Sequence, residues 1–314
     1  MPKKRNVLFD HDGGVDDLLS LMLLLTMPHI NLVGLVVTPA DCYLRPAVSA
    51  SFKILRFFNR LDIEVSTGML HGVNAFPRAW RTHAYVVDVL PILNETPWQM
   101  EPPQPLPEAG HQFIARKLRE SHDPLTILVT GPLSNLAKAL KNDPELSQKI
   151  EEVIWMGGAL NVPGNVRDYE HSGSAEWNAY WDPPAVHSIW QTDVPLTLFP
   201  LDATNQVRVT LEFLHRLAGQ RRYPLSDLAG QCWALTVGAI PAYEYIYHMW
   251  DTLTTAYLGI PQAITIREAT THVIDRGPDA GTTQEIAVGG KRINVADQVH
   301  VENFYNYILH QFQR

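Results

Sequence analysis

The sequence predicts an α/β fold, with a single open, mostly parallel, Rossmann-like sheet, helices on both faces and a small C-terminal β element. Two observations indicate this class. Short apolar runs of strand length alternate with segments of helical periodicity along the 314 residues. Acidic or glycine-containing turns follow several of these runs directly, as at the carboxyl ends of parallel strands. No shift in composition marks a boundary, so we expect one domain over residues 1–314.

The predicted strands are apolar or β-branched runs that are bounded by turn residues. The first one leads into the glycine pair Gly13-Gly14, which permits a tight turn. The last two are β-branched and are expected to form a hairpin at the edge of the sheet. The predicted strands are 7–9, 30–37, 63–66, 125–129, 153–156, 195–199, 263–274 and 284–288.

The predicted helices are longer segments whose apolar residues recur at helical spacing. The segment 211–247 is expected to be mainly helical, with breaks near Gly219 and Pro224, and the proline-rich segment 91–107 to be a surface loop. The other predicted helices are 18–26, 47–58, 79–89, 112–120, a helix that ends at 140, 183–192, 252–258 and 301–312.

Charge and composition restrict the classes of function. A net charge of −8 argues against a nucleic-acid partner, which normally selects a basic face. Two cysteines cannot form a disulfide framework, which favours a reducing compartment. The longest apolar stretch, 18–27, is too short to cross a bilayer, and the basic cluster at 3–5 leads directly into the first strand. We therefore expect a cytoplasmic protein without a membrane partner.

Four carboxylates lie within eight residues directly after the first predicted strand: Asp10, Asp12, Asp16 and Asp17. A helix N-terminus stabilises a nearby negative charge by only about 0.3–1 kcal/mol, too little to offset four. A hard divalent cation would offset them, and oxygen ligands favour calcium or magnesium over zinc. The alternative is a helix cap in a solvated acidic turn. The density of charge after an apolar strand favours a metal site.

Other polar groups also follow predicted strands, so they are expected at the same edge of the sheet. Each has an ordinary structural explanation when it is taken alone, because an Asp after a strand commonly caps a turn and a Thr-Gly-Pro sequence is commonly only a turn. The groups are Asp41, Thr130-Gly131, Met156-Gly157-Gly158 with Asn165, Glu176-Trp177-Asn178, and Trp250-Asp251.

Taken together, these motifs resemble those of the nucleoside hydrolases. The opening Asp10-His11-Asp12-Gly13-Gly14-Val15-Asp16-Asp17 is similar to the calcium-binding signature of that family. Four later motifs match in order: Thr130-Gly131-Pro132-Leu133-Ser134-Asn135, Met156-Gly157-Gly158-Ala159, Gly164-Asn165-Val166 and Glu176-Trp177-Asn178. With Asp251, the resemblance covers most of the chain.

The resemblance implies specific roles for these residues. Calcium would be held by Asp12, Asp17, Asp251 and the carbonyl of Thr130, and Asp12 would also be the general base that activates water. Asp10 would not bind calcium itself but would contact the residues that do. The side chains expected near the ribose are Asp16, Met156, Asn165, Glu176, Trp177 and Asn178.

Several positions resemble the purine-specific branch of the family, which prefers inosine, adenosine and guanosine. Trp250 stands directly before the last calcium-ligand Asp, where many members carry a histidine. Trp80 and Trp250 match two tryptophans that sandwich the purine, and Asp41 would contact the base or the 5′ side. The ordinary alternative is that both tryptophans are core residues. This branch also suggests a homodimer, with a tetramer as the alternative, and a role in purine salvage.

The sequence therefore predicts a calcium-dependent hydrolase that cleaves purine ribonucleosides to base and ribose. Three alternatives remain open. The first is a hydrolase with broad specificity or one that accepts pyrimidine nucleosides. The second is a haloacid-dehalogenase-like phosphatase, in which Asp10 would be the nucleophile and Asp12 its acid and base. The third is a non-catalytic nucleoside-binding protein. We interpret His248 as a structural residue.

Overall fold

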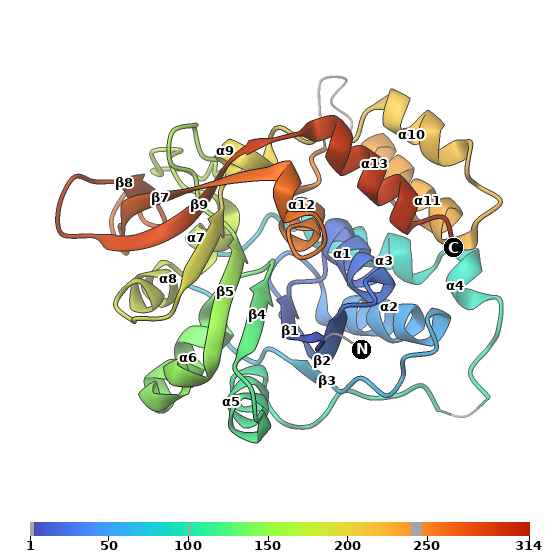
Figure 1. Cartoon of the computed structure of the whole chain (residues 1–314), viewed down its shortest axis with the longest axis horizontal. Coiled ribbons are helices and arrows are strands. Elements are labelled where there is room, and N and C mark those ends of the chain that lie inside the picture. The colour runs from blue at the N-terminus through green and yellow to red at the C-terminus, as the bar shows by residue number, and fades with distance from the viewer. Residues whose placement is uncertain (1–2, 100, 240–246) are drawn as a thin grey trace.

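The computed structural model describes residues 3–99, 101–239 and 247–314, apart from the side chains of residues 238 and 239 (Figure 1). The described residues contain a nine-stranded sheet in the order β3-β2-β1-β4-β5-β6-β9-β7-β8. The strands are β1 Arg5–His11, β2 Ile30–Val37, β3 Val65–Thr67, β4 Leu125–Val129, β5 Ile150–Met156, β6 Leu196–Phe199, β7 Ile264–Val273, β8 Thr283–Glu285 and β9 Lys291–Val299.

Helices connect the strands and cover the sheet (Figure 1). The α-helices are α1 Val15–Thr26, α2 Leu44–Phe57, α3 His83–Asp88, α4 Pro91–Asn94, α5 Gly110–Glu120, α6 Ser134–Asn142, α7 Trp177–Trp181, α8 Pro183–Trp190, α9 Leu201–Thr204, α10 Leu211–Ala218, α11 Pro224–Ala239, α12 Trp250–Ala256 and α13 Val301–Gln311. Short 3-10 helices are η1 Trp80–Thr82, η2 Pro144–Lys149 and η3 Pro261–Ala263.

Strand β1 lies between β2 and β4, and it is parallel to both. The chain passes from β1 to β2 and β3 on one side, and then returns to β4 on the other side. This reversal makes the connections after β1 and β4 leave in opposite directions, and they open a crevice at the carboxyl ends of these strands. The predicted fold class is confirmed, because β1 to β6 pair in parallel, as do β6 and β9. Strand β7 pairs in antiparallel fashion with both β9 and β8.

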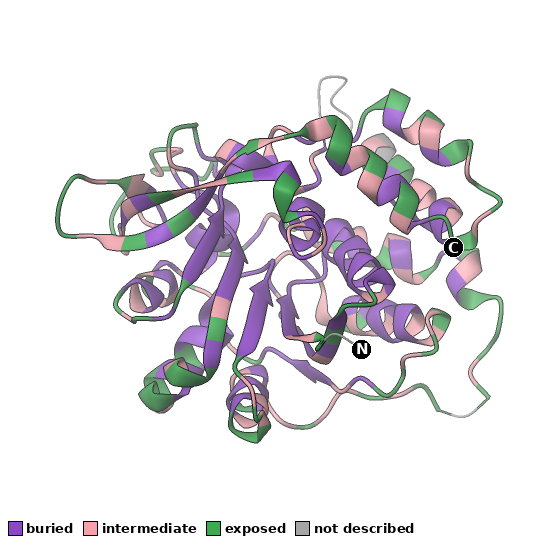
Figure 2. Cartoon of the chain, in the orientation of Figure 1, coloured by how far each residue is buried: buried purple, intermediate pink, exposed green. Residues whose placement is uncertain are grey.

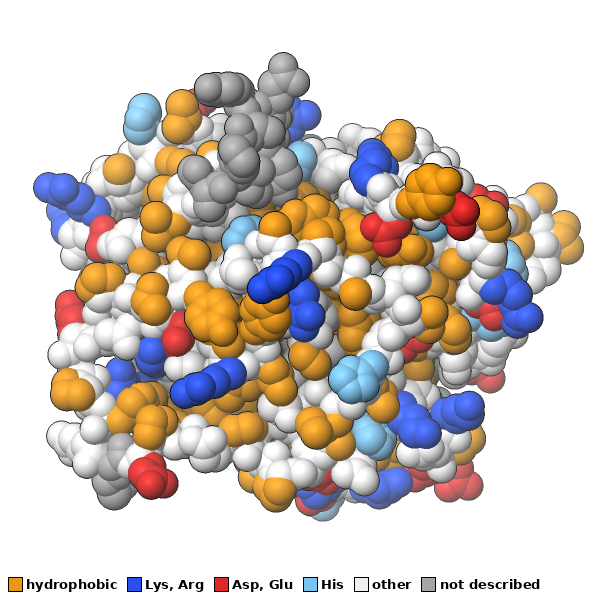
Figure 3. All heavy atoms as spheres, turned by 180° about the vertical axis from the view of Figure 1, so that it is seen from behind, with side chains coloured by type: hydrophobic (Ala, Val, Ile, Leu, Met, Phe, Trp, Pro, Cys, Tyr) orange, Lys and Arg blue, Asp and Glu red, His pale blue; other side chains and the backbone are white. Residues whose placement is uncertain are grey.

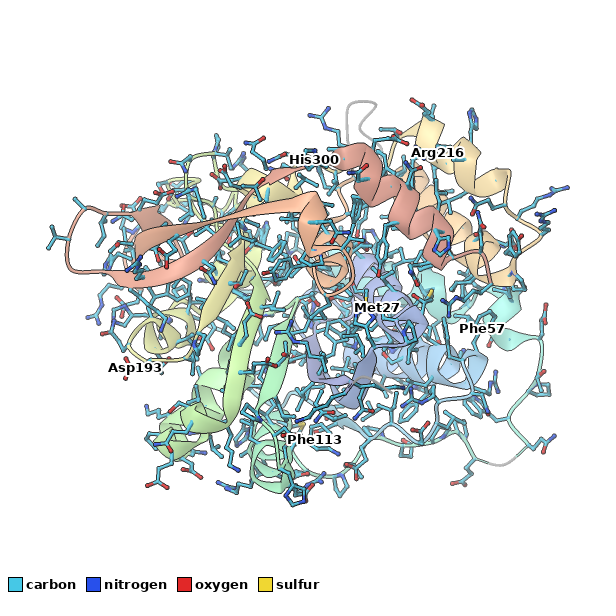
Figure 4. All side chains as sticks on the ribbon, viewed as in Figure 1. Met27, Phe57, Phe113, Asp193, Arg216 and His300 are labelled. Carbon is cyan, nitrogen blue, oxygen red and sulfur yellow. The ribbon has the colours of Figure 1, made fainter. Side chains whose placement is uncertain are left out.

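Each face of the sheet has its own hydrophobic core, because successive side chains of a strand point to opposite faces. Val7 and Phe9 of β1 pack with α1, α2, α11, α12 and α13, whereas Leu8 packs with α5, α6 and α8. Met27 and Phe113, which are labelled in Figure 4, belong to the first and the second core respectively. The central strands are buried along most of their length (Figure 2). The two cores hold the carboxyl ends of β1 and β4 rigidly.

The C-terminal β element is larger than predicted. Strand β7 matches the expected run at 263–274, and β8 pairs with it in antiparallel fashion. Strand β9, which was not predicted, lies between β6 and β7, and it joins the β7–β8 pair to the parallel sheet. The predicted hairpin at the edge of the sheet is confirmed, because β7 and β8 are the last two strands in the sheet order, but β9 beside them was missed. The second run of the hairpin was placed at 284–288, although only the first residues of that run are in a strand.

Two other predictions need correction or restriction. The segment 91–107 is not entirely a loop, because Pro91 begins the short helix α4, where proline is well tolerated at the first position. The segment 211–247 forms α10 and α11 with a break between them, as expected, but its residues 240–246 lie outside the described part. The single-domain interpretation stays a prediction.

The surface shows no feature that changes the expected classes of partner. In the described part of the chain, no helix has both the length and the apolar character needed to cross a membrane. The face in Figure 3 carries Lys and Arg side chains in scattered groups between hydrophobic and neutral ones. The absence of a nucleic-acid partner stays a prediction from the net charge.

Candidate active site

A cavity of about 430 Å³ lies where the carboxyl ends of β1, β4, β5 and β6 meet the loops that follow them. Its volume is within the range of small-molecule sites, about 300–1,000 Å³. Eleven of the residues that the sequence singled out line it: Asp12, Asp41, Trp80, Thr130, Met156, Asn165, Glu176, Trp177, Asn178, Trp250 and Asp251. The cavity thus gathers groups from distant parts of the chain, as predicted from their places after strands.

Two glycines allow the acidic turn to take its shape. Gly13 has a φ of +78°, a left-handed conformation that favours glycine. Gly131, in the turn after β4, approaches Asp12 so closely that an added Cβ would lie 2.9 Å from the Cβ of Asp12. Side chains at either position would displace the acidic turn. These contacts explain why the turns after β1 and β4 carry glycine.

Asp12 and Asp17 are buried carboxyl groups that lie close enough to interact with each other. Burial raises the pKa of Asp12 well above its ordinary value, and the negative charges of Asp17 and Asp41 raise it further. Burial also raises the pKa of Asp17, to about 6, against hydrogen bonds that lower it. Asp17 accepts from the backbone N–H of Gly14 at 2.8 Å and from the hydroxyl of Thr130. The pair is therefore fixed in place between β1 and β4.

Asp16 faces helix α12 and does not line the cavity. Its Oδ2 accepts from the backbone N–H groups of Asp251 at 2.7 Å and Thr252 at 3.0 Å, and its Oδ1 accepts from the hydroxyl of Thr252. Met249, the residue before α12, has no side-chain capping bond, so Asp16 caps this helix from another part of the chain. Its expected contact with ribose stays a prediction.

Asp10 also lies behind the cavity wall. It accepts from Thr38 Oγ1 at 2.9 Å and from Asn135 Nδ2 at 3.1 Å, and Asn135 also donates to the hydroxyl of Thr38. Burial raises the pKa of Asp10 to about 7. A carboxylate that is buried, hydrogen-bonded and outside the cavity lining is badly placed as a nucleophile. This geometry disfavours the phosphatase alternative, which needs Asp10 in that role.

Glu176 caps α7 and orders the wall beside β5. Its carboxylate accepts from the backbone N–H groups of Gly158 at 2.9 Å, Asn178 at 2.9 Å and Ala179 at 3.2 Å. Burial raises the pKa of Glu176 to about 7 despite these bonds. Asn178 Nδ2 donates to the carbonyl of Thr130 at 2.8 Å, so this wall is joined to the turn after β4.

The oxygen-rich wall of the cavity fits a hard divalent cation. Asp12, Asp17 and Asp251 are buried near one another, and the carboxylate charges raise the pKa of Asp251 beyond the effect of burial. Asp41 Oδ1 is buried without a hydrogen-bond partner. In the described part of the chain, however, no three acidic, histidine or cysteine side chains already form a metal-ligand group. The donor chemistry fits calcium, and the ligand set stays a prediction.

Aromatic rings also line the cavity. Trp177 packs against Phe76 at 5.2 Å and edge-on against Trp80 at 5.4 Å between ring centroids. On the wall formed by α12, Trp250 packs edge-on against Tyr247 at 5.0 Å. Trp80 and Trp250 are both only partly buried, and both line the cavity. Both also pack against hydrophobic core clusters, so their role in stacking the base stays a prediction.

Sequence reasoning missed several residues of the cavity wall. His248 was interpreted as structural, but it lines the cavity, with its ring 5.3 Å from that of Trp250. Asn205 follows α9, and a search for polar residues shortly after the strand at 195–199 would have found it. The other lining residues without a predicted role are Phe76, His83, Pro163, Gly164, Arg167, Leu201 and Tyr247.

Comparisons with known proteins agree with this geometry. A family model described as inosine-uridine preferring nucleoside hydrolase matches residues 7–306. A pyrimidine-specific ribonucleoside hydrolase RihA of Shewanella baltica strain OS185 is 32% identical over 216 residues, 68% of this chain and 64% of the relative. A probable uridine nucleosidase 2 of Arabidopsis thaliana is 26% identical over 69% of this chain and 66% of the relative. The match thus spans less than two thirds of these curated relatives.

Solved structures match over nearly the whole chain. An inosine-uridine preferring nucleoside hydrolase from Bacillus anthracis is 39% identical, with a TM-score of 0.92, and the match covers 98% of this chain and 99% of that one. A purine-preferring ribonucleoside hydrolase from Gardnerella vaginalis has a TM-score of 0.78 at 23% identity, with 98% of each chain covered. The second likeness shows the fold alone.

Proposed function

Because the chain belongs to the inosine-uridine preferring nucleoside hydrolase family, we propose that it hydrolyses the N-glycosidic bond of ribonucleosides to free base and ribose. One observation carries this proposal. Buried carboxylates and aromatic rings line the same cavity, so a sugar and a base would each meet a suitable wall. A cavity of about 430 Å³ is large enough for such a small ligand.

Cleavage of a ribosyl C–N bond develops positive charge on the sugar. Carboxylates fixed beside the sugar stabilise that charge in the transition state without reorganising. Asp12 lies at the junction of β1 and the cavity, where it can take a proton from the attacking water. General base catalysis of this kind contributes about 10²–10⁴-fold. These groups supply the electrostatic and proton-transfer parts of the reaction.

The same carboxylates support a proposal of calcium dependence. The ion would be held by Asp12, Asp17, Asp251 and the carbonyl of Thr130. All four ligands are hard oxygen atoms, which suit a hard cation. When bound, calcium supplies positive charge that orients a water molecule and lowers its pKa. The carbonyl of Thr130 is already oriented by Asn178. The protein's own contribution is therefore a rigid set of oxygens at the ends of β1, β4 and α12.

Two asparagines support recognition of the ribose hydroxyls. The Oδ1 atom of Asn165 accepts from the backbone N–H of Trp177 at 3.1 Å, which leaves its NH2 group to donate to a ligand. Asn178 donates to the carbonyls of Thr130 and Met156, which leaves its Oδ1 as an acceptor. A hydroxyl needs both kinds of partner. We expect poor cleavage of 2′-deoxynucleosides, because these groups would lose a partner.

Purine preference is a finer proposal, and it is supported by the aromatic rings of the cavity. Trp80 and Trp250 come from different elements and line the same space, so a flat base could lie between them. Aromatic stacking contributes about 0.5–1.5 kcal/mol per pair beyond the area buried. Burial and the charge of Asp17 raise the pKa of Asp41 well above its ordinary value, and the charge of Arg81 opposes this effect. Asp41 lines the cavity as well. Asp41 is therefore available to contact the base or the 5′ side.

A second candidate is a hydrolase that accepts uridine or has broad specificity. The observation in its favour is that proteins similar to this chain include a pyrimidine-specific ribonucleoside hydrolase and an inosine-uridine preferring nucleoside hydrolase. A pyrimidine base also stacks on tryptophan, but its single ring covers less of the indole than the two rings of a purine. The two candidates share the carboxylates and differ in the fit of the base.

The test is product analysis after incubation with inosine and, separately, with uridine, each with calcium and with excess chelator. Release of hypoxanthine, little uracil, and loss of activity with the chelator would support the purine-preferring, calcium-dependent enzyme. Similar turnover of uridine would support the second candidate. Binding of both nucleosides without release of base would instead indicate a non-catalytic binding protein.

A further inference from the structure

Asn205 lines the cavity directly after α9 and is bonded to Trp250. Its Oδ1 accepts from the indole Nε1–H of Trp250 at 3.1 Å. Its backbone N–H donates to the carbonyl of Leu201 at 3.0 Å, so the residue is held at the end of the helix. Asn205 thus connects the end of β6 to the proposed stacking surface on α12.

This bond determines which way the Asn205 amide points. An indole N–H is a donor only, so it must meet the carbonyl oxygen of the amide and not its NH2 group. Within the described part of the chain, Asn205 Nδ2 donates no hydrogen bond to the protein, and it is not sealed from the cavity as a buried, unpaired atom would be. The group that Asn205 can offer to a ligand in the cavity is therefore a hydrogen-bond donor.

We propose that Asn205 donates from Nδ2 to an exocyclic carbonyl oxygen of the nucleobase. A base stacked on the Trp250 face presents its edge beside that ring, where Asn205 lies. The site would then favour bases with an oxygen at purine C6 or pyrimidine C4, namely hypoxanthine, guanine and uracil. It would disfavour adenine and cytosine, whose amino group at the corresponding place would meet another donor. This inference rests on the proposed function of the same cavity, and it holds for purines and pyrimidines alike.

A purely supporting role for Asn205 makes a different prediction. If the residue only orients Trp250, its loss would weaken stacking of every base to a similar extent. A hydrogen bond to the base changes the ratio between oxygen- and amino-substituted bases. Since hypoxanthine and adenine share the purine ring and differ at C6, their relative affinity separates the two roles.

The experiment measures the dissociation constants of hypoxanthine and adenine by quenching of tryptophan fluorescence, with the full chain in calcium. The variants are Asn205→Asp and Asn205→Ala. A carboxylate at position 205 still accepts from Trp250, but it offers an acceptor to the base, so the preference for hypoxanthine should fall about tenfold or more. With alanine, the two affinities should approach each other. Asn306→Asp, an exposed site on α13 that accepts from Arg216, is the matched control for the added charge.

The outcomes separate this inference from the proposed function. An unchanged ratio in both Asn205 variants, with or without weaker binding of both bases, overturns the inference. A wild-type protein that binds adenine as tightly as hypoxanthine, or binds neither, also overturns it. Failure of the wild type to hydrolyse inosine or uridine, while hypoxanthine still binds selectively, overturns the proposed function and leaves the base contact of Asn205 supported.

Discussion

The Oδ2 atom of Asp16 accepts a hydrogen bond from the backbone N–H of Asp251 at 2.7 Å, across 235 residues of sequence. Asp16 is in the first turn of α1, and Asp251 is in the first turn of α12. One buried carboxylate thus connects the N-termini of two helices. These helices carry Asp17 and Asp251, two of the proposed metal ligands. Four predictions follow from this and the other contacts of the cavity.

The first concerns the contribution of Asp16 to stability. Asp16→Ala should lower the free energy of unfolding by about 2–3 kcal/mol, because three donors at the N-terminus of α12 lose their buried hydrogen-bond partner. Urea unfolding measures this change. Glu302→Ala, which removes an exposed carboxylate paired with Arg216, should change it by less than about 1 kcal/mol. Equal losses in both variants would contradict the capping role.

The second prediction concerns Asp12 as general base. Asp12→Ala should abolish nucleoside hydrolysis, with a loss of at least about 10²-fold in kcat, and leave a folded protein. Steady-state kinetics with inosine and circular dichroism measure the two properties. Asp182→Ala is a suitable control, since it removes a carboxylate that accepts from Ser134 outside the cavity lining. A near-wild-type rate in the Asp12 variant would exclude Asp12 as the base.

The third prediction concerns activation of the leaving base by Trp250. Trp250→Ala should reduce turnover of purine nucleosides far more than hydrolysis of a nitrophenyl riboside, whose leaving group needs no protonation. Stacking on the indole can favour protonation of the purine, and this assistance would be lost. Trp98→Ala, at a tryptophan stacked under Arg56 outside the cavity lining, serves as the control. Equal losses on both substrates would show that Trp250 does not activate the base.

The fourth prediction concerns pH and cation binding. Burial raises the pKa of Asp17 to about 6 and holds those of Asp12 and Asp251 well above their ordinary values. A raised pKa in the folded protein means that folding favours the protonated carboxyl group. The stability gained in this way is fully present below the pKa of the unfolded chain, about 4, and it is lost as the pH rises through the pKa of the folded protein. A divalent cation requires the ionised form. The stabilisation by calcium should therefore increase with pH from about 5 upward.

The measurement is the melting temperature in calcium and in chelator across this pH range. The quantity to compare is the difference in melting temperature between calcium and chelator, because His11 makes the protein less stable as the pH falls, whereas the raised carboxyl pKa values make it less stable as the pH rises. Burial lowers the pKa of His11 to about 3, and this contribution is largely common to both conditions. Magnesium at the same concentration is a useful comparison. A calcium effect that is constant or falls with rising pH would argue against binding by the buried carboxylates.

Much of the site was predictable because its residues lie in short local patterns. The strand before Asp12, the glycine turn and the start of α1 all follow from side-chain periodicity and backbone preferences within about twelve residues. Parallel strands then place the residues after β1, β4 and β5 on one edge. This reasoning brought Asp12, Thr130 and Met156 to one cavity, whereas Trp80 was singled out only through the family resemblance.

Neither strand β9 nor the role of Asn205 was predicted from the sequence, and the physical reason is different in each case. The β9 segment alternates polar and apolar residues only in part, and its pairing with β6 and β7 depends on the twist and position of the whole sheet. Asn205 is an ordinary polar residue in its local sequence. Its significance comes from one hydrogen bond to Trp250, which lies 45 residues further along the chain.

By itself, the sequence determined the alternation of strands and helices, the acidic turn after the first strand and the resemblance to one enzyme family. Only the tertiary structure decided that Asp16 caps α12, that Trp80 and Trp250 line one cavity, and that Asn205 offers a donor there. Local patterns reflect backbone preferences and the periodic burial of side chains. The partner of a buried polar group depends instead on which distant segments the two cores bring into hydrogen-bonding distance.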